Sequence, residues 1–486
     1  MDETKKFVFD VGVTFIATML VTIIGFVLSI FLARYLGPGD LGVYREALTF
    51  NSIATLICAI GIPPAMIKYL AQYREDKLKI DQYTSSSIIT CILFGIIFIF
   101  LFYFSSGLIA YVFKMPKLEI LIKILVFSFP FSLLNIVLLS FLNGLRKMKL
   151  YGISIIIQNI AMAVITVFFV YKGWGSTGAV LGIFLSSTIL SIFLIICCRN
   201  YFEFTFKSYK ETTKILLNYG ARILSTSALN EINNQMDIIL VGILLISSSV
   251  GFYSVAVGLS NFFWIIPLSI QKITYPATSE YWGKNNKSAI NTMMNKTMKY
   301  STVILVFLGL LVGFFATDII NILYKSNYLY AVIPLQILLI GTVIRGSIAQ
   351  PISGALISIG KANLTFKITA LMMSINVILD IILIPHFDIM GAAISSTISL
   401  AGGAFLNLFF TVKHLSIKVD VNWFLKMIGV VIFALILFKA WTLFLSTVIV
   451  GPIILALYLI GIFKIFITEE DVYTFKSLIN SAIYRR

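Results

Sequence analysis

Apolar stretches separated by short polar loops follow one another along almost the whole chain. Because an α-helix needs about 20 residues to cross the hydrocarbon of a bilayer, the pattern predicts an all-α integral membrane protein with about 14 transmembrane helices. The first stretch is too long for a cleavable signal peptide, so we expect it to be the first anchor. The expected spans are Val11–Ala33, Ala47–Ile67, Thr84–Phe104, Leu118–Leu142, Tyr151–Tyr171, Gly178–Cys198, Ile215–Gly242, Gly251–Ile273, Tyr300–Ile320, Ala331–Ile359, Leu364–Ile384, Gly391–Val412, Trp423–Leu443 and Thr447–Ile467.

Composition and charge agree with this pattern. Of the 486 residues 59% are hydrophobic and only 12% are charged, which is more apolar surface than a soluble domain can bury. At the chain ends and in every second loop lie 28 of the 37 Lys and Arg residues. Cytoplasmic loops carry the excess of these residues, so we expect a multi-pass plasma-membrane protein with cytoplasmic N- and C-termini. The net charge of +16 is then a topology signal, and no nucleic-acid partner is expected.

The sequence also contains a weak internal repeat, with corresponding segments separated by roughly 210 residues. Paired halves in a membrane protein indicate a transporter whose cavity lies between them. The matching pairs are Gly42–Tyr44 with Gly251–Tyr253, Leu108–Lys114 with Ile319–Lys325, and Gly178–Val180 with Gly391–Ala393.

The repeat predicts the domain organisation. Residues 1–198 form a first six-helix bundle, 199–214 a cytoplasmic basic linker, and 215–414 a second six-helix bundle. Residues 415–486 add two further transmembrane helices and a cytoplasmic tail. An even number of spans in each half makes the repeats parallel, related by an axis along the membrane normal and arranged around a central cleft.

Motifs for enzymatic chemistry are missing. There is no phosphate-binding glycine loop followed by Lys-Ser/Thr, and no Cys/His spacing that predicts a metal. The four cysteines fall in or beside apolar spans, so we expect them to pack as small hydrophobic residues. Only His386 or His414 could serve the alternative of a membrane acyltransferase. We therefore expect a secondary transporter without catalytic residues, cofactor or metal.

Polar residues inside the seventh span are the main candidates for a transport site. Thr226, Asn230, Asn233 and Asp237 recur at helical spacing on one face, flanked by Ser227, Glu231 and Asn234. Such a stripe either lines a water-filled cleft or joins helices by hydrogen bonds between Asn and Ser side chains. Arg222 adds a positive charge before the stripe.

Three other charged residues are further candidates. Arg345 lies inside the tenth span, and Asn135 is its counterpart in the first half. Arg345 either pairs with a carboxylate such as Asp237 or Asp380, or presents a bidentate donor to a phosphate. Arg45 and Glu46 begin the second span, where they form either an interfacial pair or part of the mouth of the cleft.

Several segments resemble signatures of the prokaryotic polysaccharide-biosynthesis flippases (the O-antigen and repeat-unit translocases) of the multidrug/oligosaccharidyl-lipid/polysaccharide exporter superfamily. They are Phe31–Tyr44, Asp237–Gly242 with Val250–Ala256, and Leu323–Gln336. The resemblance covers roughly residues 7–415, and the two remaining spans agree with fourteen-span members. Arg45 and Glu46 depart from the family pattern, which usually has small or apolar residues there.

The resemblance implies a function: translocation of a polyprenyl-(pyro)phosphate-linked oligosaccharide across the cytoplasmic membrane for cell-surface polysaccharide synthesis. Glu231 and Asp237 are candidates for coupling transport to H⁺ or Na⁺, because both lie in the polar stripe. The expected partners are the lipid-linked substrate, membrane lipids and proteins of polysaccharide assembly. A multidrug/cation antiporter or a lipid II flippase of the same superfamily stays an alternative, as does a membrane glycan polymerase or ligase.

Overall fold

The computed structural model describes residues 3–465, and every regular element in this range is helical. Short 3₁₀- and π-helical turns interrupt the longer helices. These helices are α1 (Glu3–Ala59), α2 (Ile62–Gln72), α3 (Lys77–Val112), α4 (Pro116–Val126), α5 (Phe129–Gly144), α6 (Met148–Phe169), α7 (Gly175–Cys198), α8 (Tyr209–Leu244), α9 (Ser247–Asn261), α10 (Ile265–Gly283), α11 (Lys287–Phe314), α12 (Ala316–Tyr324), α13 (Val332–Ile344), α14 (Ser353–Ser358), α15 (Ala362–Phe387), α16 (Ile389–Leu415), α17 (Val421–Trp441) and α18 (Thr447–Ile465).

Nine helical stretches of the described residues are long and apolar enough to cross a membrane, and the bent pair α4–α5 can make a tenth. They confirm the prediction of an all-α, multi-pass membrane protein. Phe9–Ala59 and Met148–Cys198 have 51 residues each. A straight helix of that length is more than twice as long as the bilayer hydrocarbon, about 30 Å, is thick. The number of fourteen spans stays a prediction.

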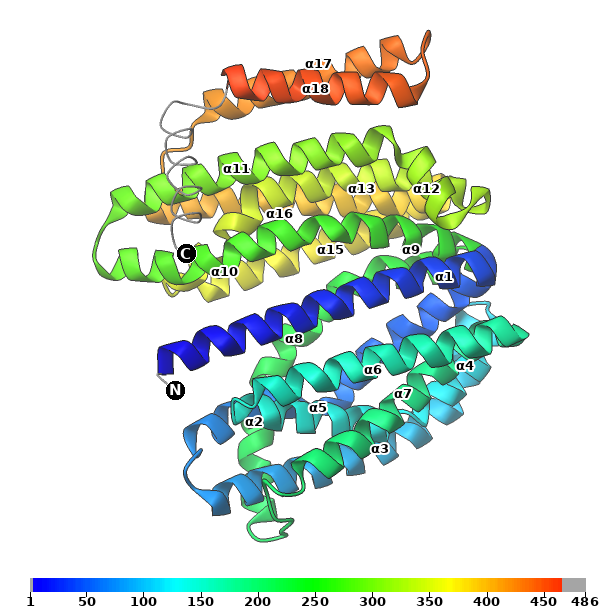
Figure 1. Ribbon diagram of the computed structural model, residues 1–486, viewed down its shortest axis with the longest axis vertical. Helices are drawn as coiled ribbons and strands as arrows, with labels where there is room; N and C mark the ends of the chain where they lie inside the picture. Colours follow the sequence, from blue (N-terminus) through cyan, green and yellow to red (C-terminus); the bar gives the residue numbers. More distant parts are fainter. Residues whose placement is uncertain (1–2, 466–486) are drawn as a thin grey trace. The chain divides into compact units, whose positions relative to one another are not determined.

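Both of these long stretches are interrupted at glycine. In α1 the backbone of Gly37 has φ 71° and ψ 173°, which divides the helix into two arms, residues 3–36 and 38–59 (Figure 1). Glycine adopts this conformation without steric cost, and the following Pro38 has no N–H to donate to the preceding turn. Between α6 and α7 the break is at Gly173, with φ 88° inside a π-helical turn.

The chain divides into two compact units. The first comprises the chain up to Ser254 with Leu323–Tyr328 and Asp380–Ala392, and the second comprises Val255–Ile322, Leu329–Leu379 and the chain from Ala393. In the first unit α2, α3, α5, α7 and α8 surround one apolar core. The first arm of α1 packs along α6, where Gly152 lies against Val13 and Ala17.

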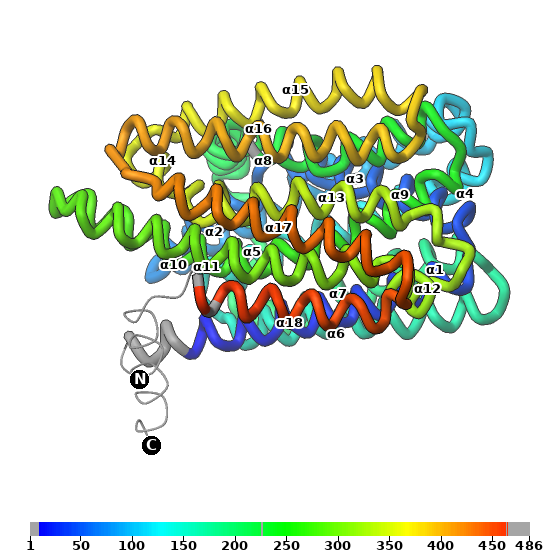
Figure 2. The backbone as a smooth tube through the Cα atoms, turned by 90° about the horizontal axis from the view of Figure 1, so that it is seen from above, coloured from blue at the N-terminus to red at the C-terminus, as the bar shows by residue number. Residues whose placement is uncertain are grey.

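In the second unit the C-terminal helices pack on α11. Figures 1 and 2 show α17 and α18 side by side. The rings of Phe314 and Phe438 stack with centroids 3.9 Å apart, and the Tyr458 hydroxyl donates to the Val303 carbonyl at 3.2 Å. Apolar contact along α11 therefore fixes the position of both helices within this unit.

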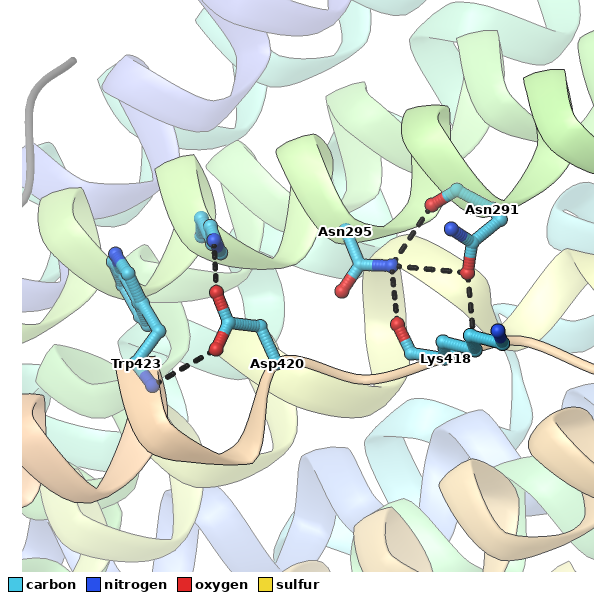
Figure 3. A network of polar contacts seen from close by, with 6 residues as sticks. Asn291, Asn295, Lys418, Asp420 and Trp423 are labelled. Atoms are coloured by element: carbon cyan, nitrogen blue, oxygen red, sulfur yellow. Dashed lines mark hydrogen bonds and ion pairs between the residues drawn. The ribbon is translucent and has the colours of Figure 1, made fainter.

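A polar network also ties the segment before α17 to α11 (Figure 3). Asn291 Oδ1 accepts from the backbone N–H of Lys418 at 2.7 Å, and Asn295 Nδ2 donates to the Lys418 carbonyl at 2.9 Å. Asp420 accepts from Lys299 Nζ at 2.7 Å and from the Trp423 N–H at 3.2 Å, so it caps α17. The hydrogen bond from Lys299 holds the pKa of Asp420 below its usual range.

Candidate functional site

The predicted polar stripe lies on α8, in the first unit. Asn230 and Asn234 are exposed, and Asn233 and Asp237 are half-buried. The Tyr253 hydroxyl donates to Asp237 Oδ2 at 2.9 Å. The side chain of Thr226 lies outside the described residues. The structure thus places two amide side chains on the surface of α8, one turn apart, with a hydrogen-bonded carboxylate nearby.

The adjoining face of α8 packs against the second arm of α1. Gln235 accepts from Thr49 Oγ1 at 3.2 Å and donates from Nε2 to Glu231 Oε1 at 3.1 Å. At the far end of this contact a Cβ on Gly220 would lie 2.8 Å from the carbonyl carbon of Gly61. Small residues let helix backbones approach closely in membranes. Glu231 is therefore linked to the α1–α8 contact through Gln235, while Asn230 and Asn234 are exposed.

Glu46 lies further along the same contact, facing Gly242. Its side chain is buried, and Oε1 has no hydrogen-bond partner among the described residues. A Cβ on Gly242 would overlap this carboxylate, so a larger residue there would force the Glu46 side chain to move. The neighbouring Arg45 is half-buried, and its Nε is likewise without a hydrogen-bond partner in the described part of the chain. Two adjacent charged side chains of α1 thus each have a buried polar atom without a hydrogen-bond partner among the described residues.

Parts of the three signature segments meet in the first unit, close to the break in α1. Arg34 Nε donates to the Leu323 carbonyl at 2.7 Å, and the Tyr328 hydroxyl donates to the Ala33 carbonyl at 2.9 Å. The ring of Phe252 lies edge-on to that of Tyr328, with centroids 6.0 Å apart. Segments almost 300 residues apart in sequence thereby form one structural cluster.

Two glycines of the internal repeat make reciprocal contacts in this cluster. A Cβ on Gly42 would overlap the backbone of Ser247, and a Cβ on Gly251 would overlap the backbone of Pro38. The spacing from Pro38 to Ser247 equals that from Gly42 to Gly251. The two contacts are therefore reciprocal in sequence, since Gly42 meets Ser247 and Gly251 meets Pro38.

In the second unit Arg345 begins a π-helical turn, Arg345–Ala349. Its guanidinium carbon lies 5.6 Å from the centroid of the Trp264 ring. Such π-helical turns inside α-helices are frequent at functional sites. The distance from the guanidinium to the indole ring is typical of a cation–π contact.

Sequence reasoning missed a group of polar residues around Pro351, contributed by α10 and by the turns after Arg345. Gln271 Nε2 donates to Ser353 Oγ at 2.7 Å, and Gln350 Nε2 donates to Gln271 Oε1, also at 2.7 Å. Thr274 Oγ1 donates to the Pro351 carbonyl at 2.7 Å, which satisfies an acceptor in the interrupted helix. The Gln350-Pro351 pair within an apolar span was the available signal, since backbone freed by proline inside a membrane needs new partners.

The two remaining candidates lie apart from the α8 stripe. Asn135 is buried between α5 and α7, where Nδ2 donates to the Ser187 carbonyl and Oδ1 accepts from Ser191 Oγ, both at 2.8 Å. Both ends of its amide are thus used in joining these helices. Arg222 is exposed on α8, two turns before Asn230.

Comparison with known proteins identifies the fold and the family. A probable flippase of Haloferax volcanii, AglR, is 23% identical to this chain over 80% of each protein. An uncharacterized membrane protein of Methanocaldococcus jannaschii is 25% identical over the full length of both. The solved structure of the lipid II flippase MurJ, in an inward closed conformation, has a TM-score of 0.75 and 21% identity and covers 93% of this chain and 98% of its own. These relatives are named as flippases or membrane proteins, and none as an enzyme.

Family models agree with the signature segments. The MatE model matches residues 223–382. The model described as "Polysaccharide biosynthesis protein" matches residues 7–282, more than half of the chain, including both arms of α1 and the whole of α8. The chain therefore belongs to the polysaccharide biosynthesis protein family.

Proposed function

We propose that this protein is a flippase that moves polyprenyl-(pyro)phosphate-linked oligosaccharides across the plasma membrane for cell-surface polysaccharide synthesis. The observation that carries the proposal is the exposed polar face of α8. From Asn230 to Asp237 the helix rises about 10 Å, and over this length it offers the amides of Asn230, Asn233 and Asn234. Amides both donate and accept hydrogen bonds, which suits the hydroxyl groups of a glycan.

Transport of a pyrophosphate also needs positive charge. Arg45, Arg222 and Arg345 are the proposed contributors, because an arginine guanidinium binds phosphate oxygens in a bidentate manner. The unpartnered Nε of Arg45 and the position of the Arg345 guanidinium over the Trp264 ring support this role. The hydrocarbon tail of the substrate can stay in lipid while its polar head group moves along protein.

A transport assay tests the role of α8. Protein reconstituted into vesicles with a lipid-linked oligosaccharide should make the glycan accessible at the opposite leaflet. Asn230→Leu with Asn234→Leu should lower the initial rate at least tenfold, because leucine offers no hydrogen bonds to the glycan. Asn363→Leu, at an exposed asparagine of α15, is the matched control and should keep the rate. Unchanged transport in the α8 double variant would contradict the proposal.

We further propose that Glu231 and Asp237 couple transport to H⁺ or Na⁺. Asparagine at position 237 still accepts the hydrogen bond from Tyr253 but carries no charge, whereas alanine removes both. If coupling requires the charge, Asp237→Asn and Glu231→Gln abolish the acceleration of transport by an imposed ion gradient. If Asp237 only holds Tyr253 in place, Asp237→Asn responds to the gradient normally and only Asp237→Ala fails.

The match to the MatE model makes a drug/cation antiporter the second candidate. The same vesicles distinguish the two functions. Efflux of a cationic dye without any glycan movement would favour the antiporter, whereas movement of lipid II alone would favour a lipid II flippase.

The proposed membrane arrangement follows from the charge distribution. Both termini lie in the cytoplasm, and the chain consists of two six-helix repeats, 1–198 and 215–414, followed by two helices. Alternating access to the two sides of the membrane completes the proposed cycle, with polysaccharide-assembly proteins as partners. Labelling of cysteines introduced into loops, from one side of the membrane at a time, tests the arrangement.

A further inference from the structure

An open cavity of ≈ 580 Å³ lies in the first unit, at the turn between α5 and α6. The turn contributes Arg146 and Lys147, the first turn of α6 contributes Lys149, and Tyr201 comes from the segment after α7. The first arm of α1 closes the cavity on another side with Asp10. None of these residues belongs to the α8 site.

Among the charged residues that line the cavity, the basic ones outnumber the acidic one. Arg146, Lys147 and Lys149 line it together with the single acidic residue Asp10. Asp10 Oδ2 lies 3.5 Å from Arg146 Nη2 and has no hydrogen-bond partner among the described residues. Asp10 therefore neutralises the site only in part, and the cavity has the charge required to hold an anion.

The backbone at the start of α6 also favours an anion in this cavity. Helix α6 begins at the cavity with Met148, and no side chain caps its first N–H groups. The N-terminus of a helix carries partial positive charge and attracts phosphate groups. Lys147 is held in place because its Nζ lies 4.8 Å from the centroid of the Tyr201 ring.

The remaining wall of the cavity is apolar. Phe9 and Ile153 line it with 50% and 41% of their surfaces exposed, on helices that belong to membrane-spanning stretches. A soluble anion would leave this apolar surface in contact with water. A hydrocarbon chain bound against it would bury the surface, which is favourable.

We propose that this cavity binds the phosphate group of a lipid, with its hydrocarbon chain packed along Phe9 and Ile153. Two sources share this chemistry, a membrane phospholipid and a polyprenyl phosphate. The polyprenyl phosphate alternative rests on the proposed function, whereas the phospholipid alternative does not. No residue of the cavity lies in the α8 site, so loss of lipid binding here and loss of transport through α8 are separate outcomes. Under either source the phosphate lies against Arg146, Lys147 and Lys149.

Native mass spectrometry of the purified full chain tests the site by counting retained lipid. The probes are phosphatidylglycerol, polyprenyl phosphate and, as a lipid without phosphate, diacylglycerol. The variant R146Q/K147Q/K149Q should bind the phosphate-bearing probe at least tenfold more weakly than the unmodified protein. The variant K287Q/K361Q/K413Q removes the same charge at exposed lysines elsewhere and should bind it normally.

Two single substitutions keep the test decisive if the triple variant does not fold. Asp10→Asn should strengthen binding severalfold by removing a competing carboxylate, and Ile153→Trp should weaken lipid binding while inorganic pyrophosphate binds as before. Retention of only one probe, phosphatidylglycerol or polyprenyl phosphate, supports the proposal and identifies the source. Equal losses in both triple variants, equal binding of diacylglycerol, or an Asp10→Asn variant with unchanged affinity would overturn it.

Discussion

The reciprocal contact of Gly42 and Gly251 yields a quantitative prediction for alanine substitutions. A Cβ on Gly42 would lie 2.7 Å from the carbonyl carbon of Ser247, and one on Gly251 would lie 2.9 Å from that of Pro38. Non-bonded carbons are normally about 3.5–4.0 Å apart, and the carbonyl oxygens of Ser247 and Pro38 would overlap the new Cβ atoms more deeply than these carbons do. Either substitution must therefore separate α1 and α9 by more than about one ångström. Overpacking of this kind lowers the free energy of unfolding by about 1–3 kcal/mol. The higher helix propensity of alanine relative to glycine offsets up to ~1 kcal/mol of this loss.

The double variant is more informative than either single one. Both substitutions require the same separation of α1 and α9. Once one alanine has separated the helices, the other should therefore lower the free energy of unfolding by less than it does alone. We expect the double variant to lose at least ~1 kcal/mol less than the sum of the single losses. Unfolding in detergent, followed by circular dichroism, measures these free energies.

Gly12→Ala and Gly25→Ala serve as controls, because a Cβ at either position of α1 has nothing within 4 Å. They should be neutral or slightly stabilising. Strictly additive losses for Gly42→Ala and Gly251→Ala, or stabilisation like that of the controls, would refute the shared-contact reasoning.

Two further predictions concern helix attachment. Asp420→Ala removes both the cap of α17 and the ion pair with Lys299 and should cost about 1.5 kcal/mol, whereas Asp420→Asn keeps a capping oxygen and should cost only about 0.5 kcal/mol for this partly exposed pair. Because the pKa of Asp420 is lowered in the folded protein, the ion-pair contribution is complete above about pH 4 and is lost as the pH falls through the folded pKa. The thermal stabilities of Asp420→Asn and the unmodified protein should therefore converge at acidic pH, and a gap that widens there contradicts the assignment. Asn135→Ala breaks hydrogen bonds between α5 and α7 and should lower stability by about 1–2 kcal/mol, while Asn159→Ala, whose amide donates to Ile155 in its own helix, should change it little in the same measurement.

Helical class and family were predictable from the sequence because both depend on local patterns. Apolar stretches of spanning length require helices in a bilayer, whatever packs around them. The signature segments are likewise contiguous runs of residues. The spacing of Asn230, Asn233 and Asp237 is enough to place them on one face of a helix, because helical geometry alone decides this.

Features that depend on packing between distant segments were not predictable in the same way. The contact of Glu46 with Gly242 and that of Thr49 with Gln235 require the antiparallel approach of α1 and α8. The repeat offset alone pointed to Asn135, whereas hydrogen bonds to Ser187 and Ser191 account for its burial. The π-helical turn at Arg345 arises from a local change of helical register, which hydropathy does not report.

The break in α1 has a mechanical consequence. Pro38 donates no backbone hydrogen bond, so the angle between the two arms can change without losing that bond of the helical ladder. One arm is attached to α6 and the other to α8. Residue 37 therefore sets the direction in which the second arm leaves the first, and Gly37→Ala should strain this bend, because φ 71° with ψ 173° is a conformation that only glycine adopts readily.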